Sequence, residues 1–350
     1  MYRNTYIEVN LDNIKENVLK IRTHCPGYKY YFGVAKANCY GHGLEAVKYM
    51  LEAGVNYLAV ATLDEALEIR KFDSNTPILC LGIIPKEYLS VARDNHVAVT
   101  ISNIEYLDEV LKYDNLVCHI EINTGMNRLG FKNKEEIKEV FDKIKSSNNK
   151  LEGIYTHIYE ASDNNLSSNQ IEVFKELTSL INLDEIEIIH IGASDYTINY
   201  PKLDFVNGCR LGIIMYGLND RLALKSTFSL ISEVIQINEV KKGETVGYNG
   251  TYEALCDSKI AVIPIGYADG ITRENKGRYV YINDNRYEIV GNVCMDMLFV
   301  KVDDNVHVND KVYLIKDNDH INYIASYLNT IPYEVICSFK KRVPIKYKEN

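Results

Sequence analysis

The chain has 350 residues, of which 46% are hydrophobic and 25% are charged, a composition typical of a folded globular protein. Its formal net charge of −9 and the absence of a basic run argue against nucleic acid or an anionic membrane as a partner. The sequence contains no signal-peptide pattern and no apolar segment approaching the roughly 20 residues of a membrane span, so a cytoplasmic protein is expected.

Eight cysteines are scattered along the chain, with neither a C-x-x-C pair nor a histidine cluster at the spacing of a zinc site. Several stand in apolar runs such as Pro77–Leu81, where a free thiol behaves as a small buried hydrophobic group. We therefore expect no structural metal, and we expect reduced thiols, which agrees with the cytosol.

Up to about residue 220, short β-rich apolar runs alternate with segments of helical periodicity such as Gly43–Ala53 and Glu135–Ser147. This alternation is typical of βα units around a parallel sheet. Eight parallel strands predict an α/β fold with a closed (β/α)8 TIM-type barrel. The eight runs are Tyr30–Ala37, Tyr57–Thr62, Pro77–Gly82, Ala98–Ser102, Leu116–Thr124, Leu151–His157, Glu187–Ser194 and Arg210–Gly217.

From about Ser229 the pattern changes to apolar segments separated by turns, which is typical of a mostly-β domain. We predict a barrel domain over residues 1–228 and a C-terminal β-domain over residues 229–350. The polar stretch Asp163–Asn169 is predicted to be a surface loop. The apolar segments of the second domain are Leu230–Val240, Ile260–Ile265, Tyr279–Asn283 and Lys311–Leu314.

Polar residues that close the barrel strands are candidates for chemistry, because active sites of such barrels lie at the C-terminal ends of the strands. Lys36 stands near the end of the first run, where the strand leaves the barrel core, and burial at that position would lower the pKa of its ammonium toward the neutral amine that Schiff-base chemistry requires. A single lysine at a strand end is more often a surface residue, so its context decides. The other candidates are Asn123, Arg128, His157, Ser194 and Arg210.

The run Val34–Gly43 (VAKANCYGHG) closely resembles the pyridoxal-phosphate lysine motif of alanine racemases. The resemblance continues along nearly the whole chain, and it implies an eight-stranded barrel followed by a β-domain. It also implies a head-to-tail homodimer whose two active sites each use residues from both chains. The further motifs, in the family's order, are Thr124–Gly130, Arg210–Ile213, Met215–Gly217, Val246–Tyr248, Ile263–Gly270 and Val293–Asp296.

The resemblance implies that Lys36 carries pyridoxal 5′-phosphate and that Tyr248, from the partner subunit, is the second catalytic group. Inverting a carbon requires removal of a proton on one face and delivery on the other, so one base per face is the simple solution. The cofactor withdraws electrons from Cα, and the protein positions the bases. By resemblance, Lys36 handles the proton of the D-enantiomer and Tyr248 that of the L-enantiomer.

The remaining site residues are also assigned by resemblance. Arg210 faces the pyridine nitrogen, and a guanidinium that stays protonated keeps that nitrogen unprotonated. The cofactor phosphate is bound by Tyr40, Ser194 and the backbone N–H groups of Gly212 and Ile213, after strands seven and eight. His157 packs against the cofactor ring, and the residues on the substrate side are Arg128, Tyr267 and the backbone of Met295.

The sequence departs from the family at several positions. Many alanine racemases have a carbamylated lysine seven residues before the position of Arg128, and here that position is Glu121. Glu121 shares one strand face with His119 and Asn123, so we hypothesise that its carboxylate replaces the carbamate, directly or through water. Further departures resemble the serine and broad-specificity branch of the family; they are Asn123, His190–Tyr196 and Met297.

The leading prediction is racemisation of alanine, which supplies D-alanine for peptidoglycan, with serine or broad-specificity racemisation as the first alternative. A second alternative is a pyridoxal-phosphate decarboxylase of the same barrel family, which would release carbon dioxide. A third is a barrel that only binds the cofactor. The complete motifs around Tyr248 and Met295 favour a racemase, and the long C-terminal segment disfavours a binding module.

Overall fold

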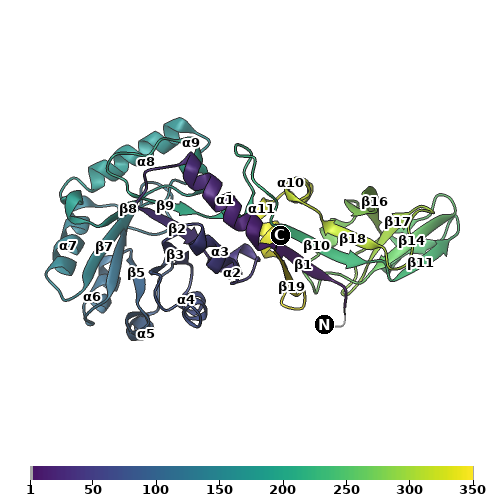
Figure 1. The fold of residues 1–350 in the computed structure, drawn as a ribbon, viewed down its shortest axis with the longest axis horizontal. Coiled ribbons are helices and arrows are strands. Elements are labelled where there is room, and N and C mark those ends of the chain that lie inside the picture. The colour runs from purple at the N-terminus through teal and green to yellow at the C-terminus, as the bar shows by residue number, and fades with distance from the viewer. Residues whose placement is uncertain (1–2, 350) are drawn as a thin grey trace.

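The computed structural model of the chain describes residues 3–349, which form two lobes joined side by side (Figure 1). The first lobe is a closed barrel of eight parallel strands that follow one another in chain order around the barrel. The prediction of an eight-stranded α/β barrel is therefore confirmed. The strands are β2 (Tyr30–Val34), β3 (Tyr57–Val60), β4 (Ile78–Cys80), β5 (Val97–Ile101), β6 (Val117–Glu121), β7 (Lys150–Tyr155), β8 (Ile188–His190) and β9 (Gly208–Leu211).

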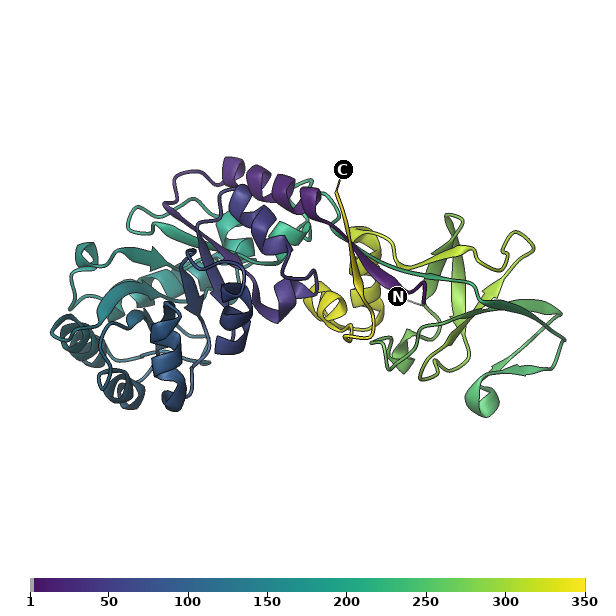
Figure 2. The same cartoon turned by 60° about the horizontal axis from the view of Figure 1, so that its bottom comes forward.

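Helices cover the outside of this barrel (Figure 2). Helix α7 shows why such a segment forms a helix on the barrel surface. Oδ1 of its N-cap residue Asn133 accepts the N–H of Glu136 (3.0 Å), and a stripe that includes Ile137, Val140 and Ile144 is buried. The helices of this lobe are α1 (Leu11–His24), α2 (Lys36–Tyr40), α3 (Ala46–Glu52), α4 (Leu63–Arg70), α5 (Leu89–Asp94), α6 (Ile104–Val110), α7 (Lys134–Lys145), α8 (Asn164–Leu177) and α9 (Ser194–Asn199), with short 3-10 turns η1 (Lys86–Tyr88) and η2 (Leu183–Glu185).

Two predictions inside the barrel lobe are wrong in detail. The polar stretch Asp163–Asn169 is not a loop, because Asp163 caps α8 and accepts hydrogen bonds from the N–H groups of Asn165 and Leu166. The first turns of α8 face solvent, so they lack the apolar periodicity that marks a helix in a sequence. The eighth apolar run also divides, since β9 ends at Leu211 and the 3-10 helix η3 (Ile213–Tyr216) follows.

The second lobe is built on a nine-stranded sheet of order β11-β14-β17-β16-β15-β18-β10-β1-β19. Strand β1 (Tyr6–Asn10) pairs antiparallel with β10 and parallel with β19, so the start of the chain contributes to this sheet. A short apolar run carries no sign of its pairing partner, so the sequence does not reveal this placement. The other strands are β10 (Phe228–Glu233), β11 (Gln236–Val240), β14 (Ser258–Ile263), β15 (Tyr279–Ile282), β16 (Asn285–Val290), β17 (Leu298–Val302), β18 (Lys311–Ile315) and β19 (Ile345–Lys348).

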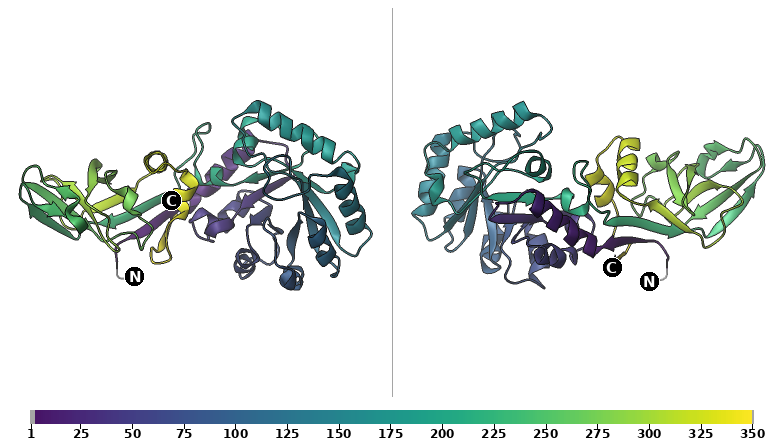
Figure 3. Two further views of the ribbon diagram at one scale, coloured as in Figure 1. Left: turned by 180° about the vertical axis from the view of Figure 1, so that it is seen from behind. Right: turned by 45° about the horizontal axis from the view of Figure 1, so that its top comes forward.

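Two helices, α10 (Asn318–Tyr327) and α11 (Pro332–Cys337), lie where the lobes meet (Figure 3). A small ribbon of β12 (Thr245–Val246) and β13 (Tyr252–Glu253) encloses the 3-10 turn η4 (Tyr248–Gly250), and η5 spans Arg273–Asn275. Gly41, directly after α2, has φ 80°, and a Cβ there would lie 2.4 Å from the carbonyl oxygen of Ile336. A glycine at this point lets α11 pack against the segment that carries Lys36.

Candidate active site

Lys36 begins a strained turn directly after strand β2. The four residues that follow it all have φ between 52° and 54°, in the left-handed region that L-residues rarely adopt. Glu65, in the first turn of α4, holds the turn by accepting the N–H of Ala37 (2.7 Å). Such strain persists only where the surroundings enforce it, and it is concentrated at functional sites.

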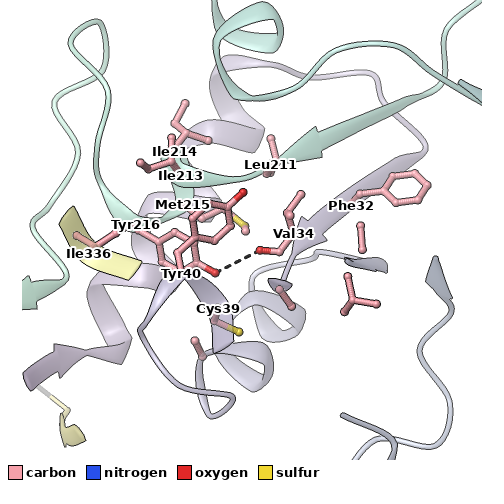
Figure 4. Packing of buried hydrophobic residues seen from close by; sticks show 14 of the residues in the cluster. Phe32, Val34, Cys39, Tyr40, Leu211, Ile213, Ile214, Met215, Tyr216 and Ile336 are labelled. Carbon is pink, nitrogen blue, oxygen red and sulfur yellow. Dashed lines mark hydrogen bonds between the residues drawn. The ribbon is translucent and has the colours of Figure 1, made fainter. Parts of the chain in front are cut away.

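The end of this turn is fixed by aromatic packing. Figure 4 shows Tyr40 lying against Tyr216 of η3, and the two ring centres are 5.3 Å apart. The hydroxyl of Tyr216 donates to the carbonyl oxygen of Val34 (3.4 Å), the last residue of β2. The segments that follow strands β2 and β9 are thereby joined around the position of Lys36.

A cavity of about 280 Å³ opens at the C-terminal ends of the barrel strands. It brings together seven of the predicted site residues, so the strand ends converge as the sequence predicts. Ile213 follows Gly212 but does not line this cavity. The seven are Lys36, Tyr40, Arg128, His157, Ser194, Arg210 and Gly212.

The electrostatics of the cavity favour a neutral Lys36. Burial lowers the pKa of its ammonium, and the nearby positive charge of Arg128 lowers it further. Burial and the charge of Arg210 lower the pKa of His157 to about 3, so this imidazole is neutral at physiological pH. A neutral lysine amine is the form that attacks an aldehyde.

Arg210 is a buried guanidinium held by five hydrogen bonds. Its Nη1 donates to Nδ1 (2.7 Å) and the carbonyl oxygen (3.0 Å) of His190. Its Nη2 donates to the carbonyl oxygens of Thr156 (2.8 Å) and Ile191 (3.2 Å) and to Nδ1 of His157 (3.3 Å). Burial lowers its pKa to about 10, so it remains charged at neutral pH. Among residues 3–349 these bonds occupy Nη1 and Nη2 and leave Nε for a ligand.

Ser194 and Gly212 form one side of a polar cradle in the same cavity. The backbone N–H of Gly212 donates to Oγ of Ser194 (3.0 Å). A Cβ at Gly212 would lie 3.0 Å from the hydroxyl oxygen of Tyr40 and 3.4 Å from Oγ of Ser194, so it would fill the space between them. Two hydroxyl groups and the N–H of Gly212 beside a space that only glycine leaves open suit a phosphate.

The loop that carries Arg128 is shaped by Asn123. The Oδ1 of Asn123 accepts the N–H groups of Gly125 (3.1 Å) and Asn127 (3.0 Å), which turns the chain directly after β6. Gly130 closes the loop, since a Cβ there would lie 2.7 Å from the carbonyl oxygen of Glu121. Arg128 itself is exposed at the cavity rim.

Glu121 lies inside the barrel, as its strand face predicts. It is 4% exposed, and its Oε2 accepts the hydroxyl of Tyr155 (3.1 Å). Within residues 3–349 it makes neither a hydrogen bond nor an ion pair with Arg128, so the direct contact that the sequence suggested is absent there. Burial raises the pKa of its carboxyl. This effect outweighs the hydrogen bond from Tyr155 and the charges of Arg128 and Arg210, which lower the pKa.

Tyr248, Tyr267 and Met295 lie together on the second lobe and do not line this cavity. The N–H of Tyr267 donates to the carbonyl oxygen of Cys294 (3.0 Å), and Nδ2 of Asn292 donates to that of Tyr248 (2.8 Å). Tyr248 is 71% exposed, Tyr267 43% and Met295 52%. The three side chains are exposed on neighbouring segments of the second lobe and lie outside the cavity of Lys36.

Several residues of the site escaped the sequence analysis. Tyr333 of α11 and Tyr155 of β7 line the cavity, and Glu65 holds the turn after Lys36. Tyr155 is the last residue of β7 and lies two residues before the end of the predicted run Leu151–His157, so its position near the site was predictable. Tyr333 reaches the cavity through the packing of α11 on the barrel lobe, which no local pattern reveals.

Among residues 3–349, no group of three or more His, Cys, Asp or Glu side chains is arranged to hold a metal ion. No helix in the same range combines the length and apolar character of a membrane span. All eight cysteines are free thiols.

The cavity combines a lysine of lowered pKa with a cradle suited to phosphate and a buried arginine. In a barrel followed by a β-lobe, this combination is typical of a pyridoxal-phosphate enzyme of the barrel type. Comparison with known proteins makes this specific. Residues 9–220 match the family model "Alanine racemase, N-terminal domain" and residues 227–347 match "Alanine racemase, C-terminal domain". The chain therefore belongs to the alanine racemase family, whose members are pyridoxal-phosphate-dependent isomerases.

Individual relatives agree over the full length. Alanine racemase 1 of Bacillus subtilis is 37% identical over 368 residues, which cover 100% of this chain and 94% of that protein. The solved structure of alanine racemase from Bacillus anthracis with bound L-Ala-P has a TM-score of 0.94 at 34% identity, covering 100% of this chain and 96% of its own. Alanine racemase from E. faecalis has a TM-score of 0.95 at 34% identity, with 99% of each chain covered.

Proposed function

We propose that this chain interconverts L- and D-alanine and thereby supplies D-alanine for peptidoglycan. The observation that carries the proposal is the cavity that joins Lys36, Arg210 and the cradle of Ser194 and Gly212. Full-length similarity to alanine racemases supports alanine as the substrate. The match to both domains of that family favours a racemase over a decarboxylase or a cofactor-binding module.

The residues of the cavity would hold pyridoxal 5′-phosphate in one orientation. Lys36 would attach the cofactor, and Ser194, Tyr40 and the N–H groups of Gly212 and Ile213 would bind its phosphate, with the Gly212 N–H turning from Oγ of Ser194 to the phosphate. Arg210, a guanidinium that only donates, would face the ring nitrogen and would keep that nitrogen unprotonated. Neutral His157 would pack against the ring. When bound, the cofactor supplies the electron withdrawal that acidifies Cα of the amino acid.

Proton transfer at Cα then falls to two side chains on opposite faces. The neutral amine of Lys36 takes or returns the proton on the face of the D-enantiomer. The hydroxyl of Tyr248 does so on the face of the L-enantiomer. Arg128 and the backbone of Met295 bind the substrate, and Tyr267 narrows the mouth of the site.

This assignment requires a homodimer, because Tyr248 is exposed on the second lobe and does not line the cavity of its own chain. A head-to-tail dimer places the second lobe of each copy over the barrel mouth of the other. The proposal also includes a cytoplasmic location, which the eight free thiols support.

The test is racemisation of L-alanine and L-serine by the purified protein with pyridoxal 5′-phosphate, followed by chiral chromatography or loss of circular dichroism. Lys36→Ala is the matched control. We expect conversion of L-alanine that depends on Lys36, with L-serine slower. No racemisation of either amino acid despite bound cofactor, or release of carbon dioxide, would contradict the proposal.

A further inference from the structure

A line of hydrogen bonds runs through the barrel interior from Arg210 toward the opposite end of the strands. Nη1 of Arg210 lies 2.7 Å from Nδ1 of His190, and Nε2 of His190 lies 3.2 Å from Nδ1 of His119. Nε2 of His119 lies 3.2 Å from Oε2 of Glu152. Glu152 precedes the cavity-lining Tyr155 by three residues on β7, so it stands toward the start of the strand. The line therefore joins the cavity to the N-terminal end of the barrel strands.

The two ends of the line fix the direction of every hydrogen bond in it. A guanidinium only donates and a carboxylate only accepts. Arg210 donates to Nδ1 of His190, so His190 carries its hydrogen on Nε2 and donates to Nδ1 of His119. His119 in turn carries its hydrogen on Nε2 and donates to Glu152. If the hydrogen of either ring moved to the other ring nitrogen, two N–H groups would point at each other.

Both histidines are neutral and Glu152 is ionised. The two imidazoles are 0% exposed, and burial lowers the pKa of each. Burial would raise the pKa of Glu152, but hydrogen bonds from His119, Lys150 and Tyr57 outweigh it and lower the pKa to about 2. The Lys150 and Tyr57 bonds measure 2.8 and 2.6 Å. The line thus begins at a buried positive charge and ends at a negative one.

Packing fixes the rings as well. His190 lies between Phe32 and Tyr155, with ring centres 4.6 and 4.7 Å apart and planes within 21° and 17° of parallel. A Cβ at Gly153 would lie 2.2 Å from Nδ1 of His119, so a glycine there leaves the space that this ring occupies. The rings cannot rotate without disturbing their neighbours, so the hydrogen positions on them depend on the charged groups at the two ends of the line.

We propose that Glu152 is a positioning residue, which acts through His119 and His190 to hold Arg210 as a donor at the cavity. The proposal rests on the proposed function, in which Arg210 faces the cofactor ring. Glu152 does not touch that site. By accepting from His119 it makes one set of tautomers favourable, and that set gives Arg210 an acceptor at His190. A neutral amide at position 152 could also donate to His119, which would permit the reversed tautomers and set His190 Nδ1–H against Arg210.

The direct test is ¹⁵N NMR of the histidine side chains in the holoenzyme. The chain contains eight histidines, and the His119 and His190 signals are assigned by comparison with His119→Gln and His190→Gln. At neutral pH we expect both rings to be neutral with the hydrogen on Nε2. A hydrogen on Nδ1 of either ring, or a charged imidazolium, would overturn the proposal. The tautomers are read from the unaltered protein, and the two histidine variants serve only to assign its signals, so the result does not depend on the folding of Glu152→Gln.

Glu152→Gln tests the effect on function, and Glu187→Gln is its matched control. Glu187 belongs to the same acidic cluster, where it binds Lys150 and Tyr30 but neither histidine. For Glu152→Gln we expect mixed tautomers at His119 and a kcat about tenfold lower, with KM for alanine nearly unchanged. Glu187→Gln should match the unaltered protein in spectrum and kcat.

The outcomes separate this proposal from the proposed function. Equal behaviour of the two glutamine variants would overturn the role of Glu152 even in an active racemase. An unaltered protein that shows the expected tautomers, and loses them only in Glu152→Gln, but racemises nothing would contradict the proposed function. The effect of Glu152 on the hydrogen positions would then stand.

Discussion

Gly212 shows how a single missing side chain shapes the cavity. A methyl group there would come within 3.0 Å of the Tyr40 hydroxyl and 3.4 Å of Oγ of Ser194. We expect Gly212→Ala to weaken the affinity for pyridoxal 5′-phosphate by about tenfold or more, because the phosphate loses room and donors. Titration of cofactor absorbance measures the Kd. Pyridoxal, which lacks the phosphate, is the control ligand, and an equal loss for both ligands would refute the assignment of the cradle.

The buried carboxyl of Glu121 leads to a prediction about how stability depends on pH. Burial raises the pKa of its carboxyl in the folded protein, so folding favours the protonated form. Its stabilising contribution is complete below the unfolded pKa of about 4.3 and is lost as the pH rises through the raised folded value. Glutamine mimics the protonated acid at every pH. We therefore expect Glu121→Gln to have a higher Tm than the unaltered protein at pH 8, with the difference vanishing near about pH 4.

The opposite result would be informative about the family departure at this position. A lower Tm for Glu121→Gln at pH 8, with weaker substrate binding, would mean that the ionised carboxylate supports Arg128 across the space between them. Unchanged turnover and affinity would instead show that Glu121 does not replace a carbamylated lysine.

At the scale of elements, the contact between α11 and the Lys36 segment ties the two lobes to one site. Gly41 has φ 80°, and a Cβ there would lie 2.4 Å from the carbonyl oxygen of Ile336 in α11. We expect Gly41→Ala to lower the free energy of unfolding by more than the roughly 1 kcal/mol of backbone strain and to weaken cofactor binding, because α11 carries Tyr333. Denaturant unfolding and cofactor titration measure the two effects.

Gly243→Ala is the matched control for that substitution. Gly243 has φ 88°, nearly that of Gly41, but a Cβ there would meet nothing within 4 Å. It should therefore show the strain alone, with cofactor affinity unchanged. If both variants lose the same stability and the same affinity, the contact between α11 and the Lys36 segment does not shape the site.

The elements also show how far the sequence determines the fold. The barrel strands were predictable because both faces of a parallel sheet are buried, which leaves short apolar runs between helical segments. The start of α8 was missed because its first turns are polar. Strand β1 was missed because its partners, β10 and β19, are distant in sequence, and pairing between distant strands leaves no local pattern.

The residues of the candidate site also fall into those that the sequence predicts and those that it does not. Lys36, His157, Ser194 and Arg210 were candidates because they stand at the ends of predicted strands, and the resemblance to a family added Gly212 and Tyr248. The line from Arg210 to Glu152 was not predictable, because it crosses the barrel interior between β9, β8, β6 and β7. Only closure of the barrel brings these strands face to face.

At the scale of the whole molecule, the separation of Lys36 from Tyr248 leads to the last prediction. If each site takes Lys36 from one chain and Tyr248 from the other, two inactive variants can complement each other in a mixed dimer. A dimer of Lys36→Ala with Tyr248→Phe has one site in which both residues are unaltered. We expect an equal mixture, refolded or coexpressed together, to regain about a quarter of the unaltered activity, since half of the dimers are mixed and each has one intact site.

The control pair is Lys36→Ala with Arg210→Ala. Both of these residues line the cavity of one barrel, so every site of a mixed dimer would still lack one of them. This pair should regain no activity, although it dimerises equally well. Recovery in the first mixture and none in the second requires that a site be shared between chains. Equal inactivity of both mixtures would instead mean that Tyr248 acts within its own chain, through a rearrangement of the second lobe. Activity of Tyr248→Phe by itself would mean that Tyr248 takes no part in proton transfer.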